Sequence, residues 1–240
     1  MANQMVFKRY ELKYLLDQRQ KEEILRAMEP HMALDRYGRT TIRNVYFDTD
    51  SYRLIRRSIE KPAYKEKLRV RSYKEAGPGD PVFVELKKKY KSVVYKRRIL
   101  LPRELAMDCL EGRTGFPDSQ IGEEIAYFCA FYGTLHPVVF LSYEREAFYD
   151  REGSDFRVTF DENILYRNRE LSLGAGICGR PLLERGRTLM EVKTSGGIPL
   201  WMARVLSEQQ AYKTSFSKYG SAYQEMLRNT LRIKGGVFYA

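Results

Sequence analysis

The chain has 240 residues, of which 43% are hydrophobic and 13% aromatic, so it can bury a substantial core, which argues against general disorder. Its 42 lysines and arginines exceed its 31 aspartates and glutamates, and the net charge of +11 favours an anionic partner: nucleic acid, a phosphorylated molecule or polymer, or an anionic membrane surface. The three cysteines lack CxxC spacing, so we expect neither a disulfide framework nor a zinc site. The sequence shows neither an 18-residue apolar run nor a signal-peptide pattern, so we expect a soluble, cytoplasmic protein.

Strands and amphipathic helices are predicted along the whole chain, with no linker or repeat between them. In chain order we expect a strand at 5–16, a helix at 17–28, a strand at 41–49, a short charged helix from Ser51, strands at 63–74, 81–90 and 92–101, helices at 102–111 and 119–132, strands at 137–150, 155–167 and 188–194, and closing helices at 198–209 and 217–231. Short turns between the third, fourth and fifth strands predict an antiparallel meander. The simplest arrangement is one α+β domain over residues 1–240.

The predicted strands share an unusual charge pattern. In "YKEKLRVRSYKE" (64–75), four cations share one side-chain parity, and Leu68 and Val70 share the other. Over seven strands the polar parity carries the cations Arg9, Lys13, Lys67, Arg69, Arg71, Lys87, Lys89, Lys96, Arg98, Arg145, Arg157 and Lys193, and the anions Glu11, Glu85, Asp161 and Glu191.

A solvated sheet face normally mixes the two signs of charge, because like charges on neighbouring strands repel each other. The cationic excess therefore predicts a barrel with helices outside and a wet lumen that holds a polyanion. The few carboxylates in such a lumen suit Mg²⁺ or Mn²⁺. Since the cations repel one another, their removal is expected to leave thermal stability unchanged or to raise it.

Eight segments, in their order along the chain, resemble the polyphosphate polymerase (vacuolar transporter chaperone, VTC) domain, a branch of the triphosphate tunnel metalloenzymes. They are "RYELKYLL", "VYFDT", "KLRVRSY", "FVELKKK", "SYEREAF", "RVTFDENI", "LMEVKTSGGIP" and "FSKYG". The resemblance covers roughly residues 5–225. It implies an α+β fold built on an eight-stranded antiparallel β-barrel, the triphosphate tunnel, with helices packed outside.

The resemblance also assigns roles to residues, motif by motif. It implies catalytic roles for Arg69, Arg71, Arg145 and Lys87, phosphate binding by Lys13, Lys96, Arg98, Tyr143, Ser217, Lys218 and Lys193, and Mn²⁺ or Mg²⁺ binding by Glu191, Glu85 and Glu11. The superfamily's first strand typically carries ExExK, whereas this chain has Arg9, Glu11 and Lys13 at the matching positions. This departure resembles the polymerase branch more than the triphosphatase and cyclase branches.

The implied activity is metal-dependent phosphoryl transfer with ATP and polyphosphate as partners, in particular polyphosphate synthesis from the γ-phosphate of ATP. Two alternatives stay open: a CYTH-like inorganic or nucleoside triphosphatase, in which water attacks, and a non-catalytic polyphosphate-binding sensor. We do not expect a nucleic-acid partner, because the cationic parities carry few aromatic stacking platforms. A membrane-protein partner that holds the domain at the inner face of a membrane stays open. For "RLIRRS" (53–58) we favour a solvated helix face over a basic patch near one tunnel mouth.

Overall fold

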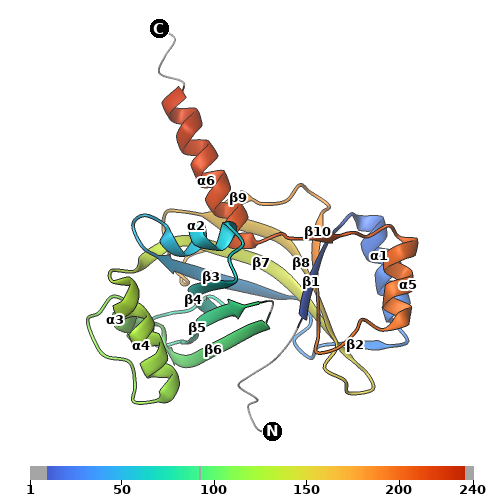
Figure 1. Cartoon of the computed structure of the whole chain (residues 1–240), viewed down its shortest axis with the longest axis horizontal. Helices are drawn as coiled ribbons and strands as arrows, with labels where there is room; N and C mark the ends of the chain where they lie inside the picture. The colour runs from blue at the N-terminus through green and yellow to red at the C-terminus, as the bar shows by residue number, and fades with distance from the viewer. Residues whose placement is uncertain (1–9, 92, 236–240) are drawn as a thin grey trace.

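A computed structural model describes residues 10–91 and 93–235 of the chain (Figure 1). Its strands are β1 (Tyr10–Leu16), β2 (Met32–Leu34), β3 (Thr40–Asp48), β4 (Tyr64–Ser72), β5 (Pro81–Tyr90), β6 (Val93–Pro102), β7 (His136–Asp150), β8 (Arg157–Arg167), β9 (Arg180–Pro181), β10 (Thr188–Thr194) and β11 (Lys213–Thr214). Its helices are α1 (Gln18–Met28), α2 (Arg53–Ile59), α3 (Arg103–Leu110), α4 (Gln120–Tyr132), α5 (Leu200–Glu208) and α6 (Lys218–Gly235). All strand pairs are antiparallel, in the order β11-β1-β10-β8-β7-β3-β4-β5-β6, with β2 beside β7 and β9 beside β8.

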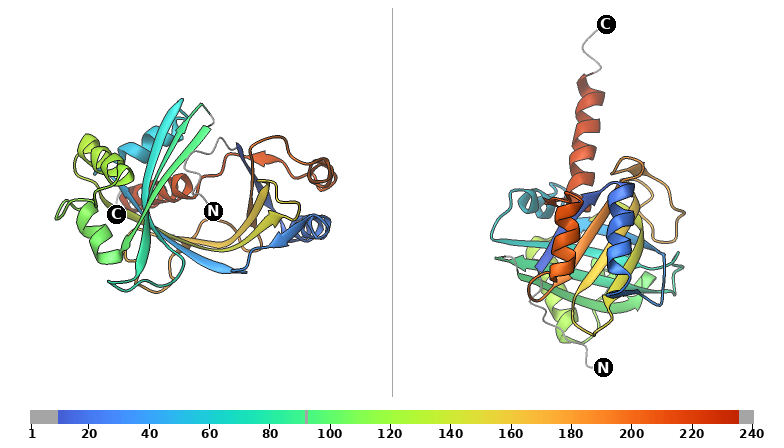
Figure 2. Two further views of the ribbon diagram at one scale, coloured as in Figure 1. Left: turned by 90° about the horizontal axis from the view of Figure 1, so that it is seen from below. Right: turned by 90° about the vertical axis from the view of Figure 1, so that its right-hand side faces the viewer.

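The eight longer strands are those predicted from the sequence, but the predicted closed, eight-stranded barrel is wrong. The sheet has eleven strands and is open, because within the described residues the edge strands β6 and β11 each pair with one neighbour only. The three unpredicted strands, β2, β9 and β11, are only two or three residues long, too short for alternation to reveal them. Figure 2 (left) shows how strongly the sheet curves, with β5 and β6 on one arm and β1 on the other.

Among the described residues, side chains rather than backbone hydrogen bonds connect the two arms of the curved sheet. The Nζ atom of Lys87 on β5 lies 3.2 Å from Oε2 of Glu11 on β1. On the same side, Lys67 of β4 donates a hydrogen bond of 2.9 Å to the hydroxyl of Ser217, just before α6. The segment that runs from β11 into α6 therefore lies between the arms, where a closed barrel would have strand pairing.

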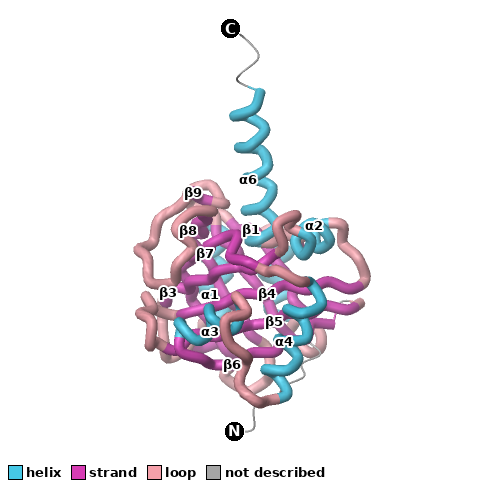
Figure 3. The backbone as a smooth tube through the Cα atoms, turned by 90° about the vertical axis from the view of Figure 1, so that its left-hand side faces the viewer, coloured by secondary structure: helices cyan, strands magenta, loops and turns pink. Residues whose placement is uncertain are grey.

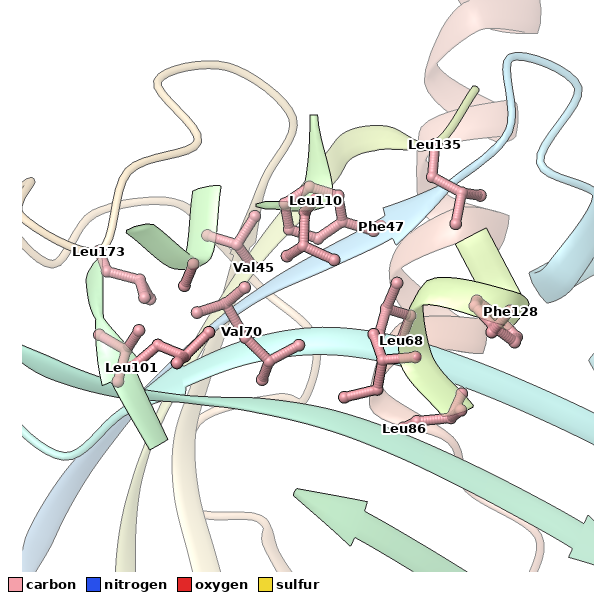
Figure 4. Close-up of a cluster of buried hydrophobic side chains, with 14 of the residues drawn as sticks. Val45, Phe47, Leu68, Val70, Leu86, Leu101, Leu110, Phe128, Leu135 and Leu173 are labelled. Carbon is pink, nitrogen blue, oxygen red and sulfur yellow. The ribbon is translucent and has the colours of Figure 1, made fainter. Parts of the chain in front are cut away.

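The convex side of the sheet is apolar and is covered by helices. On β3, β4 and β5 the side chains of Val45, Leu68 and Leu86 pack against Leu110 of α3 and Phe128 of α4 (Figure 4). Each fully buried side chain of this kind contributes about 1.5–3 kcal/mol to folding. The charged parity of the same strands therefore faces the opposite, concave side, which we call the inner face.

The other arm is covered in the same way. Helices α1 and α5 lie side by side over β1, β8 and β10 (Figure 2, right). Leu16, Val158 and Met190 of these strands pack against Ile24 of α1 and Met202 of α5. As the sequence predicts, Asp17 caps α1, because its carboxylate accepts a hydrogen bond from the backbone N–H of the third helical residue.

Helix α6 begins inside the concavity and then leaves it. Tyr219 and Ala222 of its first turns pack against inner-face residues that include Tyr46, Leu141 and Tyr143. Beyond these turns the helix projects away from the sheet (Figures 1 and 3). The first turn of α6 therefore forms one end wall of the inner face. Across the part of the chain that is described, no helix combines the length and the apolarity needed to cross a bilayer.

Asp48, at the end of β3, fixes both α2 and α6. Its fully buried carboxylate accepts hydrogen bonds from the backbone N–H groups of Thr49 (2.9 Å), Leu54 (2.8 Å) and Ile55 (3.0 Å) and from the hydroxyl of Tyr219 (2.8 Å). The N–H groups of Leu54 and Ile55 are donors in the first turn of α2, that of Thr49 lies in the preceding turn, and the Tyr219 hydroxyl holds the first turn of α6 against the sheet.

Replacing Asp48 by alanine is therefore expected to lower the free energy of unfolding by about 3–4 kcal/mol, because several buried donors lose their acceptor at once. Denaturant unfolding measures the change. The matched control is Asp50→Ala, whose side chain is 94% exposed and whose loss is expected to cost less than about 0.5 kcal/mol. Equal stabilities of the two variants would contradict the anchoring role of Asp48.

Candidate functional site

Glu191 of β10 is the centre of the first charged cluster on the inner face. Its carboxylate lies 3.4 Å from Nζ of Lys13, 3.2 Å from Nζ of Lys193, 3.2 Å from Nζ of Lys218 and 3.3 Å from Nη2 of Arg145. Burial alone would raise the pKa of this carboxyl, but the four cations hold it well below its usual value. The carboxylate is ionised, and its single negative charge faces four positive charges.

Asp161 of β8 is the second acid of this cluster. It is fully buried and forms a two-point ion pair with Arg145, of 2.5 Å from Nε and 2.6 Å from Nη2. Nζ of Lys218 lies 2.5 Å from the same carboxylate. Since Lys218 contacts both Asp161 and Glu191, the first turn of α6 is tied directly to the two acids.

Glu85 of β5 is the centre of the second charged cluster. Arg69 contacts it at 2.7–2.8 Å through Nη2 and Nε, Nε of Arg71 lies 3.8 Å away, and Lys96 of β6 forms a further ion pair. Burial would raise the pKa of the Glu85 carboxyl, but the three cations hold it well below its usual value. One buried carboxylate thus faces three cations.

Neutral side chains orient the two arginines of this cluster. Arg69 donates a hydrogen bond of 2.9 Å to the hydroxyl of Tyr46. Arg71 donates hydrogen bonds of 3.0 Å to the side-chain oxygen of Asn44 and of 3.1 Å to the hydroxyl of Tyr143. The remaining guanidinium N–H groups have fixed directions, which suits two-point binding of a phosphate group.

Rows of lysines adjoin these clusters. The strand register places Lys67 of β4 opposite Lys87 of β5, and Lys87 opposite Lys96 of β6. Like charges directly opposite each other destabilise a sheet. Burial lowers the pKa of Lys67 well below its usual value, and the neighbouring cations, Lys13 and Lys87 foremost, lower it further. A bound polyanion would remove this repulsion.

Lys96 links the lysine row to Glu85. Burial lowers its pKa to about 7; the ion pair with Glu85 opposes the shift, and Arg71 and Arg69 add to it. Lys96 therefore has a pKa within the physiological pH range.

The affinity of the inner face for tripolyphosphate is expected to fall as the pH rises above about 7, because Lys96 loses its proton and a bound anion must restore it. The decrease from this group is at most about tenfold per pH unit. In Lys96→Arg, whose guanidinium stays charged, this part of the pH dependence is expected to vanish. Calorimetric titrations of both proteins at several pH values check it, and identical profiles would contradict it.

Most of the residues that the sequence predicts for the site contact one another on the inner face, and Arg98 is the exception. Those brought together are Glu11, Lys13, Arg69, Arg71, Glu85, Lys87, Lys96, Tyr143, Arg145, Glu191, Lys193, Ser217 and Lys218. Arg98 instead is exposed on the edge strand β6, where its guanidinium lies 4.9 Å from the ring centre of Phe83. Arg9 lies outside the described residues.

Four inner-face residues were not assigned to the site from the sequence. Asp161 was counted in the charge pattern but given no role, although it binds Arg145 and Lys218. Lys67 belongs to the cationic parity, but the family resemblance gives it no role, whereas in the structure it donates a hydrogen bond to Ser217. Asn44 and Tyr46 orient the arginines, and neither belongs to a charged pattern.

The carboxylates of the inner face fit a Mg²⁺ or Mn²⁺ ion bound together with a phosphate ligand. Among the described residues, no group of three or more histidine, cysteine, aspartate or glutamate side chains is arranged to hold a metal ion by itself. Glu191 and Asp161 nevertheless lie close together, since both contact Lys218. Mg²⁺ is commonly held by one or two carboxylates plus substrate phosphates, which is the donor set available here.

Comparisons with known proteins agree with this geometry. A family model described as the VTC domain matches residues 8–227, which is most of the chain. Among solved structures, a candidate adenylate cyclase of Bacillus halodurans has a TM-score of 0.55 at 14% identity, with 88% of this chain and 96% of that chain covered. No curated protein matches the sequence.

Two further structures have the same fold. A candidate adenylate cyclase of Vibrio parahaemolyticus has a TM-score of 0.51 at 14% identity, with 92% of this chain and 97% of that chain covered. A candidate adenylyl cyclase of Hippeastrum, described as having a dominant triphosphatase activity, has a TM-score of 0.51 at 15% identity, with 88% and 92% covered. At these identities the likeness concerns the fold alone.

Proposed function

Because the chain belongs to the VTC domain family, we propose that its inner face binds ATP and a linear polyphosphate and transfers the γ-phosphoryl group of ATP to the end of the chain. The observation that carries the proposal is the uncompensated positive charge of the inner face. Glu85 faces three cations, Glu191 faces four, and Lys67 lies opposite Lys87. A ligand with many closely spaced negative charges removes this repulsion, whereas a singly charged ligand would not.

In the proposed reaction a terminal phosphate oxygen of the polyphosphate attacks the γ-phosphorus of ATP. The bond between that phosphorus and the β–γ bridging oxygen breaks, and ADP leaves with the electron pair. The protein contributes position and charge neutralisation rather than a covalent step. Arg69, Arg71 and Arg145 can each hold phosphate oxygens at two points, and Lys13 and Lys87 act as point charges.

Binding would exchange ion-pair partners within the site. Without ligand, Arg145 is paired with Asp161 and Glu191. When phosphates bind to Arg145 and Lys218, the two carboxylates lose cationic partners and can hold Mg²⁺ or Mn²⁺ instead. The metal, when bound, would neutralise charge on the transferring phosphoryl group and on the leaving group.

Two other functions use the same residues. If water takes the place of the polyphosphate oxygen, the product is orthophosphate and the protein is a triphosphatase, the activity described for the Hippeastrum protein of similar fold. If no transfer occurs, the protein is a polyphosphate sensor. We favour the polymerase because the family match is to the VTC domain.

The experiment that separates the three functions is incubation of the purified protein with ATP and Mn²⁺ or Mg²⁺, followed by analysis of all phosphate products. ADP together with a polymer that stains as polyphosphate supports the polymerase. Orthophosphate without polymer, from ATP or from tripolyphosphate, supports the triphosphatase instead. Binding without turnover leaves the sensor, and absence of both binding and turnover contradicts all three. A reaction with excess chelator is the control for metal dependence.

A further inference from the structure

Helix α2 carries a basic surface that the proposed reaction does not use. Leu54, Ile55 and Ser58 are buried against the rest of the fold, whereas Arg56 and Arg57 are exposed. The exposed Lys61 follows directly after the helix, and Arg53 at its start is exposed as well. From residue 51 to 65 the chain has five cations and a single acid, Glu60.

This basic surface is continuous with the inner face. Lys65, at the start of β4, donates a hydrogen bond of 3.2 Å to the backbone carbonyl of Ser58 in α2. Lys65 lies opposite Lys89 of β5, and the next inner-face pair along the two strands is Lys67 and Lys87. Burial lowers the pKa of Lys65, and Lys89 and Lys61 lower it further, so Lys61, Lys65 and Lys89 are close enough to repel one another.

The acid nearest to these lysines along β4 does not neutralise them. Glu66 points to the convex side, where it is buried and accepts hydrogen bonds of 2.5 Å from the hydroxyl of Tyr64 and 2.7 Å from that of Tyr132. Glu60, at the C-cap of α2, is exposed. The row of Lys61, Lys65 and Lys89 that joins the inner face to α2 therefore keeps a positive excess, whereas Arg57 lies near Tyr64 and Tyr132, whose hydroxyls bind Glu66.

We propose that Arg56, Arg57 and Lys61 form a second binding site for linear inorganic polyphosphate, outside the concavity and joined to it through Lys65 and Lys89. The proposal rests on the proposed function, since it requires a phosphate chain on the inner face. Lys65 lies six residues along β4 from Arg71, a distance of about 20 Å at about 3.3 Å per residue. A triphosphate held at Arg71 does not reach α2, whereas a long chain does. The second site therefore makes the protein prefer long chains.

The test compares two ligands on matched variants. In Arg56→Gln/Arg57→Gln/Lys61→Gln, affinity for tripolyphosphate is expected to stay within about twofold of wild type, whereas affinity for long-chain polyphosphate falls at least about tenfold because the second point of attachment is lost. The control, Arg19→Gln/Arg26→Gln/Arg204→Gln, removes the same charge from exposed positions on α1 and α5 and is expected to bind both ligands like wild type.

Each other outcome has a distinct meaning. If the wild type binds neither ligand, the proposed function itself fails. If it binds both and the α2 variant keeps full affinity for long chains, the second site is refuted while the proposed function stands. Equal losses in the α2 variant and the control would show a net-charge effect only, which also refutes the site. If the α2 variant lost the binding of single-stranded oligonucleotide and kept the binding of polyphosphate, the surface would be assigned to nucleic acid and the proposal overturned.

Discussion

Replacing Arg69 and Arg71 together by alanine is expected to weaken tripolyphosphate and polyphosphate binding by at least about a hundredfold, since each charge-assisted contact is worth about 1.5–3 kcal/mol. Both guanidinium groups are held by neutral partners, Tyr46 for one and Asn44 for the other, so they present their free N–H groups in fixed directions. Calorimetric titration of each ligand measures the loss. An affinity within threefold of wild type would contradict the assignment of these arginines to phosphate.

The stability of this variant needs its own control. Mutual repulsion among the cations predicts that the double variant is as stable as wild type or more stable. The contacts of Glu85 predict instead that it is less stable. This carboxylate is only 1% exposed, and the double variant leaves it with Lys96 alone among the cations described above. Loss of partners from a buried charge is destabilising. Adding Glu85→Gln to the two alanines is therefore expected to recover stability without recovering binding. Recovery of both would mean that the arginines act only through folding.

Replacing Glu191 by glutamine is expected to lower divalent-dependent turnover at least about a hundredfold while phosphate binding is retained. Without metal, the carboxylate competes with the ligand for Lys13, Arg145, Lys193 and Lys218. Metal-free affinity for tripolyphosphate is therefore expected to equal or exceed that of wild type. Product formation from ATP and metal-free titration are the two measurements.

The matched control for this change lies on β7, which is separated from β10 by β8. Glu144 of β7 immediately precedes Arg145 and points to the other side of the sheet, where it pairs with Arg39. Glu144→Gln is expected to retain full turnover. If Glu191→Gln also kept full turnover, Glu191 would have no metal-binding role. If it lost phosphate binding together with turnover, the carboxylate would serve the architecture of the site instead.

The sequence predicted the strands well because most of the eight long strands have one face against helices and one charged face. Val70 and Arg71 of β4, for example, belong to opposite faces, and alternation reports this directly. Comparing several strands also indicated that the cations face inward, because a solvated face would mix the two signs of charge. The site residues followed from this pattern and from the family resemblance.

What the sequence could not predict depends on contacts between distant segments. Whether the curved sheet closes is decided at its edges, where β11 pairs with β1 over two residues before the chain turns into α6. The position of Lys218 between Asp161 and Glu191 likewise depends on Tyr219 binding Asp48, 171 residues earlier. Neither contact leaves a periodic signal. Arg98 shares both the edge strand and the parity of Lys96, but it is exposed and packs over Phe83, and parity does not report this difference.

The central claim is that the inner face holds a chain of phosphates. A crystal structure of the protein with tripolyphosphate and Mg²⁺ tests it most directly. We expect phosphate oxygens within hydrogen-bond distance of Arg69, Arg71 and Arg145, and Arg145 turned at least partly away from Asp161. Tripolyphosphate bound only outside the concavity, with the pairs Arg145–Asp161 and Arg69–Glu85 unchanged, would contradict the claim.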